Sequence, residues 1–352
     1  MSEKILIKGN EAVGAALIAA GCKTYFGYPI TPQSEVPEYL ARELPKIGGT
    51  FLQAESEVAA INMLYGSAGT GTRVATSSSS PGVSLMQEGI SYIAACELPC
   101  MIINMMRGGP GLGSIQPSQT DYFQSTRGGG NGDYRTLTLA PASIQEMVDL
   151  IHLGFDLADE YRTPVIMCGD GMLGQMMEPI EFKEFETKTF DKSDWAATGT
   201  QGKREPHIIN SLFLSPDELE AQNKKLIAKY KAITENEKRA EVIDVEDADI
   251  VFTAFGTTSR ICRSAGELLK AEGYKVGYVR PITLWPFPDN AYDKINDKWK
   301  VILDVELNQG QMVEDVRLAV LGRIPVEFYG RQGGMIPTAE ELRDVALKLL
   351  EA

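Results

Sequence analysis

Short apolar runs alternate with helical patterns along the first 185 residues. Helix start signals lie between most of these runs: prolines at Pro32 and Pro81, and a capping box formed by Ser143 and Glu146. Alternating strands and helices predict an α/β fold with a doubly wound, mostly parallel sheet, whose ligands gather at the carboxyl ends of the strands. The predicted strands cover residues 5–7, 25–28, 51–53, 73–76, 101–105, 137–139 and 165–168.

The pattern changes after residue 185. Residues 186–240 begin as a polar stretch without periodicity and continue as a charged surface helix that starts at Ser215 and Pro216. Alternation returns further on and predicts a second, smaller α/β domain. The sequence therefore predicts a large domain at 1–185, a linker with a surface helix at 186–240, and a small domain at 241–352. The strands expected in the small domain cover residues 250–256, 275–281, 301–309 and 325–330.

Composition excludes several classes of protein. The chain has 352 residues and a formal net charge of −14, which disfavours nucleic acid and anionic membrane surfaces as partners. Its five cysteines form no CxxC pair and it has only two histidines, so we expect no disulfide framework, no metal site on this chain and a reducing cytoplasm. The N-terminal apolar stretch is interrupted by Glu11, and we expect neither a signal peptide nor a membrane span.

Charge density separates the two halves of the chain. Residues 1–185 carry 31 charged side chains, whereas residues 186–352 carry 51. We therefore expect the first part to bury more of its surface, either internally or against other chains.

Two predicted strand ends lead into helices with polar residues. In Gly27–Pro32, free amides and the Thr31 hydroxyl favour an anion, although a well-capped helix explains the same pattern. Glu55 and Glu57 lie at the next strand end, where a carboxylate gains from the helix dipole alone. The apolar residues that follow would hold such an acid against a packed surface, where it can share a proton with a ligand nitrogen.

Two further strand ends add small hydroxyls and a cation. The serine run 77–80 allows close approach of a ligand, or is simply a loop, and Arg107 suits a bidentate contact with a carboxylate. The glycine-rich run at 109–113 is not a dinucleotide fingerprint, because it does not join the first strand to its helix. Asp170 likewise begins no complete thiamine diphosphate and magnesium motif, and His152 fits a structural histidine inside a helix.

Taken together, these strings resemble the α subunits of the 2-oxoacid:ferredoxin oxidoreductases. The motifs are YPITP at 28–32 and RGGP at 107–110 with its trailing Gln119 and Asp121, and the likeness covers nearly the whole chain. Within the family, the resemblance is strongest to enzymes of the branched-chain 2-oxoacid 2-oxoisovalerate (3-methyl-2-oxobutanoate). The matching segments are residues 9–35, 53–71, 79–99, 104–121, 128–135 and 306–312.

The resemblance implies a multi-subunit thiamine diphosphate enzyme. It implies a pyrimidine-binding-like domain followed by a transketolase C-terminal-like domain, with thiamine diphosphate shared with a β subunit. Mg²⁺ and iron–sulfur clusters are expected on partner subunits, which include an iron–sulfur ferredoxin-like subunit and a γ subunit. The implied reaction is oxidative decarboxylation of a 2-oxoacid with coenzyme A to acyl-CoA, carbon dioxide and reduced ferredoxin. Because ferredoxins are acidic, we expect ferredoxin to dock on the cluster-bearing subunit rather than on this chain.

The resemblance also assigns roles to single residues. Glu57 falls on the acid that contacts the pyrimidine ring, with Glu55 as the second candidate, while Thr31 and Arg107 match positions that hold the substrate carboxylate. The residues assigned to the cofactor are Glu57, Pro29, Ile30, Ser78 and Ser79. The family often has a histidine where Asn131 stands, which leaves the role of this residue open.

The sequence leaves alternatives for the substrate and for the function. The loop after Arg107 has no other basic residue before Arg127, which favours a substrate with an apolar side chain over 2-oxoglutarate, while pyruvate is a further alternative. A non-catalytic scaffold subunit would retain the fold without turnover. A free-standing nicotinamide dehydrogenase would require the isolated chain to bind NADH.

Overall fold

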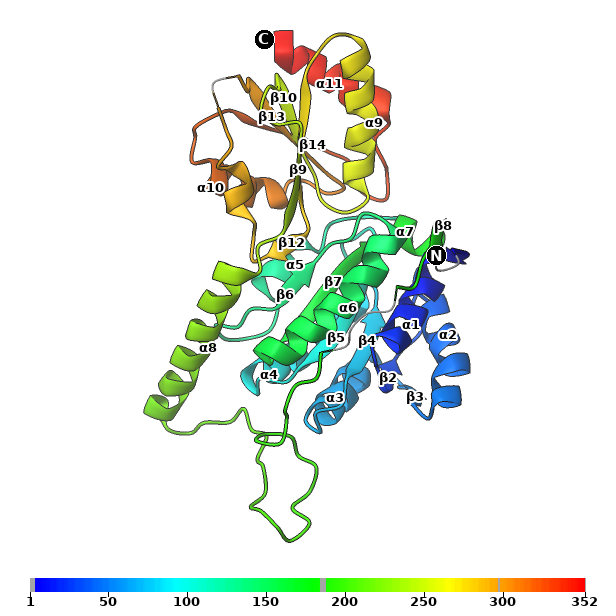
Figure 1. Cartoon of the computed structure of the whole chain (residues 1–352), viewed down its shortest axis with the longest axis vertical. Helices are drawn as coiled ribbons and strands as arrows, with labels where there is room; N and C mark the ends of the chain where they lie inside the picture. The colour runs from blue at the N-terminus through cyan, green and yellow to red at the C-terminus, as the bar shows by residue number, and fades with distance from the viewer. Residues whose placement is uncertain (1–3, 184–187, 297, 352) are drawn as a thin grey trace.

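The larger sheet has seven strands, and six of them run parallel, as the alternating pattern predicts. The structure is a computed structural model that describes residues 4–183, 188–296 and 298–351. Figure 1 shows the larger sheet in the lower part of the molecule and a smaller domain above it. In spatial order the strands of the larger sheet are β12 (Thr283–Trp285), β6 (Leu137–Leu139), β7 (Pro164–Asp170), β5 (Cys100–Met106), β4 (Val74–Ser78), β2 (Thr24–Gly27) and β3 (Thr50–Gln53).

Helices cover both faces of this sheet, so it is doubly wound. The hydrophobic core on one face joins strand residues such as Met101 mainly to a first group of helices, and the core on the other face joins Ile102 mainly to a second group. The first group is α1 (Gly9–Ala19), α2 (Glu35–Glu43) and α6 (Ile144–Tyr161), and the second is α3 (Glu57–Ala68) and α4 (Ser80–Ala95). The remaining elements of this region are η1 (Leu44–Ile47), α5 (Tyr122–Arg127) and α7 (Gly171–Gln175).

The first predicted strand lies outside the main sheet. β1 (Ile5–Lys8) pairs with β8 (Met177–Ile180) in a separate antiparallel ribbon. Figure 1 shows this ribbon near the N-terminus. A strand of four residues carries no local signal for its partner, so its pairing is determined by contacts with residues that are distant in the sequence.

The connecting region contains an extended segment and one long helix. Residues 188–214 form turns but no helix or strand, and Figure 1 shows this segment below the larger domain. The helix α8 (Pro216–Asn236) begins at the predicted proline and buries Leu226, Tyr230 and Ile233, while Leu219 stays 41% exposed. The three buried side chains belong to the core of the larger domain.

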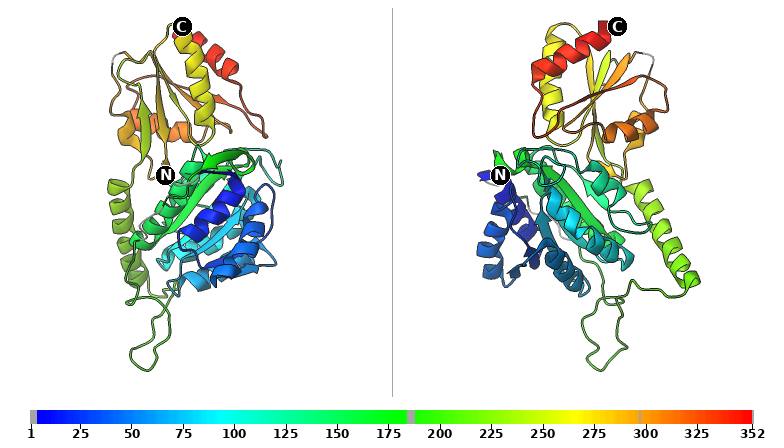
Figure 2. Two further views of the ribbon diagram at one scale, coloured as in Figure 1. Left: turned by 45° about the vertical axis from the view of Figure 1, so that its right-hand side comes forward. Right: turned by 180° about the vertical axis from the view of Figure 1, so that it is seen from behind.

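The smaller domain has a five-stranded sheet with helices on both faces (Figure 2). The predicted strands and helices are present, and the antiparallel edge strand β9 and the last helix come in addition. The strands in spatial order are β14 (Val326–Gly330), β13 (Val301–Glu306), β10 (Ile250–Thr253), β11 (Val276–Pro281) and β9 (Ala240–Ile243). The helices are α9 (Thr258–Ala271), η2 (Asp289–Tyr292), α10 (Met312–Val320) and α11 (Ala339–Glu351).

The two domains share strands, core and polar contacts. β12 leaves the smaller domain to pair with β6, and one hydrophobic cluster runs through both domains by way of Tyr122 and Phe255, whose rings lie 5.6 Å apart. Arg280 of β11 is 8% exposed and pairs with Glu146 at the start of α6, with a nitrogen–oxygen distance of 2.8 Å. Among the described residues, no helix has the length and apolar character to cross a bilayer.

Candidate active site

Four neighbouring strands bring the predicted site residues to one edge of the larger sheet. Arg107 follows β5, Ser78 ends β4 and Ser79 follows it, Thr31 lies after β2, and Glu57 lies after β3. These strands are adjacent in the order β5, β4, β2, β3 and run parallel. Their carboxyl ends therefore meet at the same edge, where doubly wound sheets bind ligands.

Glu57 is a buried acid at the first position of α3. Ser56 caps the helix, since its hydroxyl accepts a hydrogen bond from Ala59 N at 3.1 Å. Glu57 is 6% exposed, and its carboxyl makes no hydrogen bond or ion pair with any residue that the structure describes. A buried acid without a partner is costly unless a ligand supplies one.

Glycine at position 82 makes room for this acid. A Cβ there would lie 2.6 Å from Glu57 Oε1 and 2.1 Å from Ser78 Oγ, both far inside van der Waals contact. The hydroxyls of Ser78 and Ser79 are fully buried and have no partner within the described part of the chain. The predicted cofactor residues therefore leave one carboxyl and two hydroxyls free for a ligand.

Pro29 and Ile30 lie in the loop after β2. Pro29 is exposed and Ile30 is half-buried, and neither has a polar side chain. Any contact they make with a ligand through their side chains is therefore apolar.

Arg107 is a buried cation without a carboxylate partner. It is 8% exposed, and no ion pair joins it to any described acid. Its Nη1 donates to the carbonyl of Thr31 at 2.8 Å and its Nη2 to that of Leu112 at 3.1 Å, while the buried Nε has no partner. Since an unpaired buried charge is strongly unfavourable, this guanidinium is suited to an anionic ligand.

Thr31 meets Arg107 through its backbone carbonyl, and its side chain is exposed. The predicted helix start at Pro32 is wrong, because α2 begins at Glu35. The Pro32 carbonyl accepts hydrogen bonds from Asn10 Nδ2 at 2.6 Å and Gln175 Nε2 at 2.9 Å, which hold residues 30–34 as turns. Thr31 therefore does not lie at a helix N-terminus, and the anion site predicted from free helix amides is not formed there.

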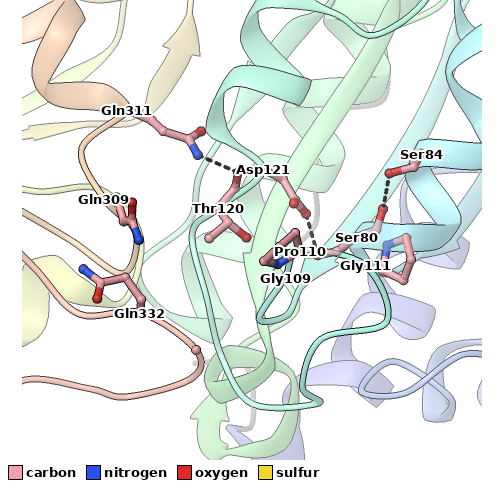
Figure 3. A pocket seen from close by; sticks show the side chains of 12 residues that line it. Ser80, Ser84, Gly109, Pro110, Gly111, Thr120, Asp121, Gln309, Gln311 and Gln332 are labelled. Carbon is pink, nitrogen blue, oxygen red and sulfur yellow. Dashed lines mark hydrogen bonds between the residues drawn. The ribbon is translucent and has the colours of Figure 1, made fainter.

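The glycine-rich segment after Arg107 forms a tight loop and no dinucleotide fingerprint. Gly113 has φ +55°, and a Cβ on it would lie 1.8 Å from the carbonyl oxygen of Gly108. Leu112 and Ile115 on this loop are 84% and 56% exposed. The loop separates two clefts: one of about 520 Å³ bordered by Thr31 and Gln116, and one of about 730 Å³ between the two domains (Figure 3).

Gln119 joins this loop to the smaller domain. Its side chain donates to Phe255 O at 2.8 Å and accepts from Thr258 Oγ1 at 2.9 Å and Leu307 N at 3.0 Å. Its backbone N–H donates to Leu307 O, and its carbonyl accepts from Asn308 Nδ2. Sequence reasoning marked Gln119 as part of a motif but could not show that it connects two domains.

Asp121, Ser80 and Asn104 form a buried cluster that sequence reasoning missed. Ser80 Oγ donates to Asp121 Oδ2 at 2.6 Å, and Asn104 Nδ2 donates to the same oxygen at 2.9 Å. Burial raises the pKa of the Asp121 carboxyl, and the two hydrogen bonds lower it in part. The sequence signals for this cluster were the position of Asp121 in the trailing part of the RGGP motif and that of Ser80 in the serine run 77–80.

Three other residues singled out in the sequence make their contacts outside the candidate site. Asp170 caps α7 by accepting from Met172 N and Leu173 N, and it also accepts from Thr257 of the smaller domain. Asn131 lies on an exposed loop, where its Oδ1 accepts from Ser91 at 3.3 Å, and makes no described hydrogen bond to the site. His152 is buried in α6, 3.9 Å from Asp156. No group of three or more potential metal ligands occurs among the described residues.

Comparison with known proteins agrees with this fold and shows the family. Residues 15–241 match the family described as "Pyruvate flavodoxin/ferredoxin oxidoreductase, thiamine diP-bdg", and residues 248–342 match "Pyruvate:ferredoxin oxidoreductase core domain II". A split-gene transketolase superposes with a TM-score of 0.62 over 98% of both chains at 15% identity, which supports the fold alone. The matched family thus places this chain among thiamine diphosphate-binding oxidoreductase proteins.

Closer relatives identify the family. The chain is 49% identical to the ketoisovalerate oxidoreductase subunit VorB of Methanothermobacter thermautotrophicus, over 98% of this chain and 97% of that protein. The structure of 2-oxoglutarate:ferredoxin oxidoreductase from Magnetococcus marinus superposes with a TM-score of 0.89 at 31% identity, over 99% of this chain. This chain spans 66% of that solved chain. The protein belongs to the 2-oxoacid:ferredoxin oxidoreductase family and is an oxidoreductase subunit, as the sequence motifs predict.

Proposed function

We propose that this chain is the α subunit of an enzyme that oxidatively decarboxylates a branched-chain 2-oxoacid, with coenzyme A as acyl acceptor and ferredoxin as electron acceptor. The observation that carries the proposal is the buried guanidinium of Arg107, which has no carboxylate partner among the described residues and lies on the same sheet edge as Glu57. A 2-oxoacid supplies the carboxylate that this cation lacks. The keto carbon of the bound 2-oxoacid then lies along the same sheet edge as Glu57.

The free polar groups fit thiamine diphosphate. When bound, this cofactor supplies the nucleophilic carbon that attacks the keto group and takes up the electron pair left by carbon dioxide. We assign the Glu57 carboxyl to the nitrogen of the pyrimidine ring. Ser78 and Ser79 are assigned to the polar edge of the same ring, and Pro29 and Ile30 to apolar contacts with the cofactor. Burial of Glu57 excludes water from the proton that this acid shares with the ring.

The substrate carboxylate is assigned to Arg107 and to the Thr31 segment. Because Nη1 and Nη2 are each held by a carbonyl, the guanidinium is oriented before the ligand arrives. The exposed side chains of Leu112 and Ile115, together with the absence of a second basic residue on this loop, favour an apolar substrate side chain. The similarity to a ketoisovalerate oxidoreductase subunit supports the same choice over 2-oxoglutarate and pyruvate.

We assign the remaining parts of the enzyme to partner subunits in the cytoplasm. These are a β subunit that shares thiamine diphosphate and holds Mg²⁺, an iron–sulfur ferredoxin-like subunit, and a γ subunit. Exposed Ile208, Leu212 and Leu214 in the extended segment offer apolar surface to such partners. The five cysteines are free and buried, which suits a reducing compartment.

Arg107→Ala in the assembled complex tests the assigned role. We expect the KM for 3-methyl-2-oxobutanoate to rise by about a hundredfold, because a desolvated charge contact is lost, with partial recovery in Arg107→Lys. The measurement is 2-oxoacid-dependent viologen reduction, repeated with pyruvate and 2-oxoglutarate. Arg127→Ala is the matched control, since Arg127 lies on the same segment but pairs with Asp315.

The same assay separates the alternatives. Unchanged turnover in Arg107→Ala would support a scaffold subunit, and a higher kcat/KM for 2-oxoglutarate or pyruvate would reassign the substrate.

A further inference from the structure

One buried hydroxyl joins both ends of the loop that follows β5. Ser80 Oγ accepts a hydrogen bond from Arg107 N at 2.9 Å, where the loop begins, and donates to Asp121 Oδ2 at 2.6 Å, where it ends. Asn104 braces this cluster, because it donates to Asp121 Oδ2 and its Oδ1 accepts from Ser80 N at 3.0 Å. Ser80 is 7% exposed, Asp121 is 8% exposed and Asn104 is fully buried.

The single hydroxyl proton of Ser80 links Asp121 to Arg107. While Asp121 takes this proton, the lone pairs of Ser80 Oγ remain available to the N–H of Arg107. Without Asp121, the proton turns toward the carbonyl oxygen of Arg107, 3.2 Å away, and the backbone contact changes. The guanidinium extends from this backbone to its two carbonyl acceptors, so a small shift at the Arg107 backbone moves the whole cation.

Asp121 also borders the cleft between the domains, beside Thr120 and Gln311 (Figure 3). Its carboxyl has three conceivable roles: transferring a proton, holding a cation in the cleft, or accepting hydrogen bonds. The geometry favours the last role, because one oxygen already receives two donors, Ser80 at the start of α4 and Asn104 near the end of β5.

We propose that Asp121 is a positioning residue for the 2-oxoacid site, which acts through Ser80 to fix the backbone at Arg107. The inference rests on the proposed role of Arg107 in binding the substrate carboxylate. Asp121 itself does not touch the substrate. Its loss therefore weakens 2-oxoacid binding and leaves the chemical steps nearly intact.

Four variants of the assembled complex test the inference. In Asp121→Ala and Ser80→Ala we expect the KM for 3-methyl-2-oxobutanoate to rise about tenfold, with kcat within about threefold of wild type. The double variant should show little more than the larger single effect, because both changes remove the same link. Asp121→Asn should recover most of the wild-type KM, since an amide oxygen can accept from Ser80 and Asn104 but cannot ionise.

Ser84→Ala is the matched control. Ser84 lies one turn further along α4 and borders the same cleft, but its hydroxyl contacts Ser80 O and Gln124 rather than Asp121. We expect its KM for the 2-oxoacid to equal that of wild type. Hydrogen exchange at the Arg107 amide gives a readout independent of turnover, and we expect faster exchange in Asp121→Ala than in Ser84→Ala.

Three results would overturn the inference: a wild-type KM and slow Arg107 exchange in Asp121→Ala, a loss in Asp121→Asn as large as in Asp121→Ala, or additive single effects. Failure of the proposed function is recognised separately, because it requires that Arg107→Ala itself leaves the KM unchanged. Faster exchange at Arg107 in Asp121→Ala would support the link to the backbone even in that case.

Discussion

Each domain contains a buried carboxyl without a hydrogen-bond partner of normal geometry among the described residues, and only one of them lies at a site. Glu57 in the larger domain is 6% exposed and borders Gly82 and the free Ser78 hydroxyl. Asp304 of β13 in the smaller domain is fully buried in the middle of a sheet, where it interacts with the carboxyl of Glu306 but neither of its oxygens makes a hydrogen bond of normal geometry. Burial of an unpaired acid is therefore not sufficient to mark an active site.

The difference lies in what surrounds each acid. Asp304 lies two residues before Glu306, whose carboxylate accepts hydrogen bonds from the backbone of Gln311, Met312 and Val313. Burial, and secondly the charge of Glu306, raise the pKa of Asp304 well above its usual range. Glu57 lies at a strand end beside small residues and unpaired hydroxyls, where a ligand can complete its hydrogen bonds. The position at the strand ends and the unpaired hydroxyls of Ser78 and Ser79 distinguish the two environments.

The largest effect expected from this comparison is on turnover. Glu57→Gln should lower kcat by about 10²- to 10⁴-fold, because the amide cannot exchange the proton assigned to the carboxyl. Asp304→Asn should leave kcat nearly unchanged. Viologen reduction by the two assembled variants checks both expectations, and equal losses would remove the distinction between the two acids.

A smaller effect on activity is expected when a side chain is added at Gly82, beside Glu57. Gly82→Ala should lower activity by about ten- to a hundredfold, because its Cβ would displace the Glu57 carboxyl and the Ser78 hydroxyl. Gly66→Ala is the matched helical control, since a Cβ at Gly66 meets no atom within 4 Å. Full activity in Gly82→Ala would show that the close approach of Glu57 and Ser78 to Gly82 is not needed.

The smallest effect concerns stability and pH. Because the pKa of Asp304 is higher in the folded than in the unfolded chain, its stabilising contribution is present below the unfolded pKa and is lost as pH rises toward the folded pKa. Asparagine does not ionise, so Asp304→Asn removes the loss of stability that wild type suffers as pH rises. The variant should therefore have a free energy of unfolding about 1–2 kcal/mol higher than wild type at pH 8, with a smaller difference at pH 5. Thermal unfolding of the assembled complex at the two pH values measures it, and a difference that grows toward low pH would show that Asp304 is charged.

Sequence patterns predicted the fold class and most strands, because the strands of a doubly wound sheet are short apolar runs between strong helix signals. The pairing of β1 with β8 and the return of β12 to the first sheet were not predictable, since strands of three or four residues acquire partners only through tertiary contacts. The start of α2 was wrongly placed for the same reason: Asn10 and Gln175 hold the Pro32 carbonyl from distant helices.

The candidate site shows the same limit. Strand ends drew attention to the segments that hold Glu57, Ser78, Ser79 and Arg107, and the family resemblance assigned the roles of the single residues. The Ser80–Asp121 link was missed, because its two residues are joined only after the loop folds back onto α4.

The return of β12 to the larger sheet determines where this polypeptide can be divided. A cut near residue 240, between the regions matched by the two family descriptions, would remove β12 and leave the outer edge of β6 without its partner. An unprotected strand edge promotes aggregation, and the cut would also remove Trp285 from the ring of Tyr230, 5.8 Å away on α8. We therefore expect a gene split at this point to give halves that aggregate more readily than the intact chain, with the N-terminal half affected most because it loses β12 from its sheet.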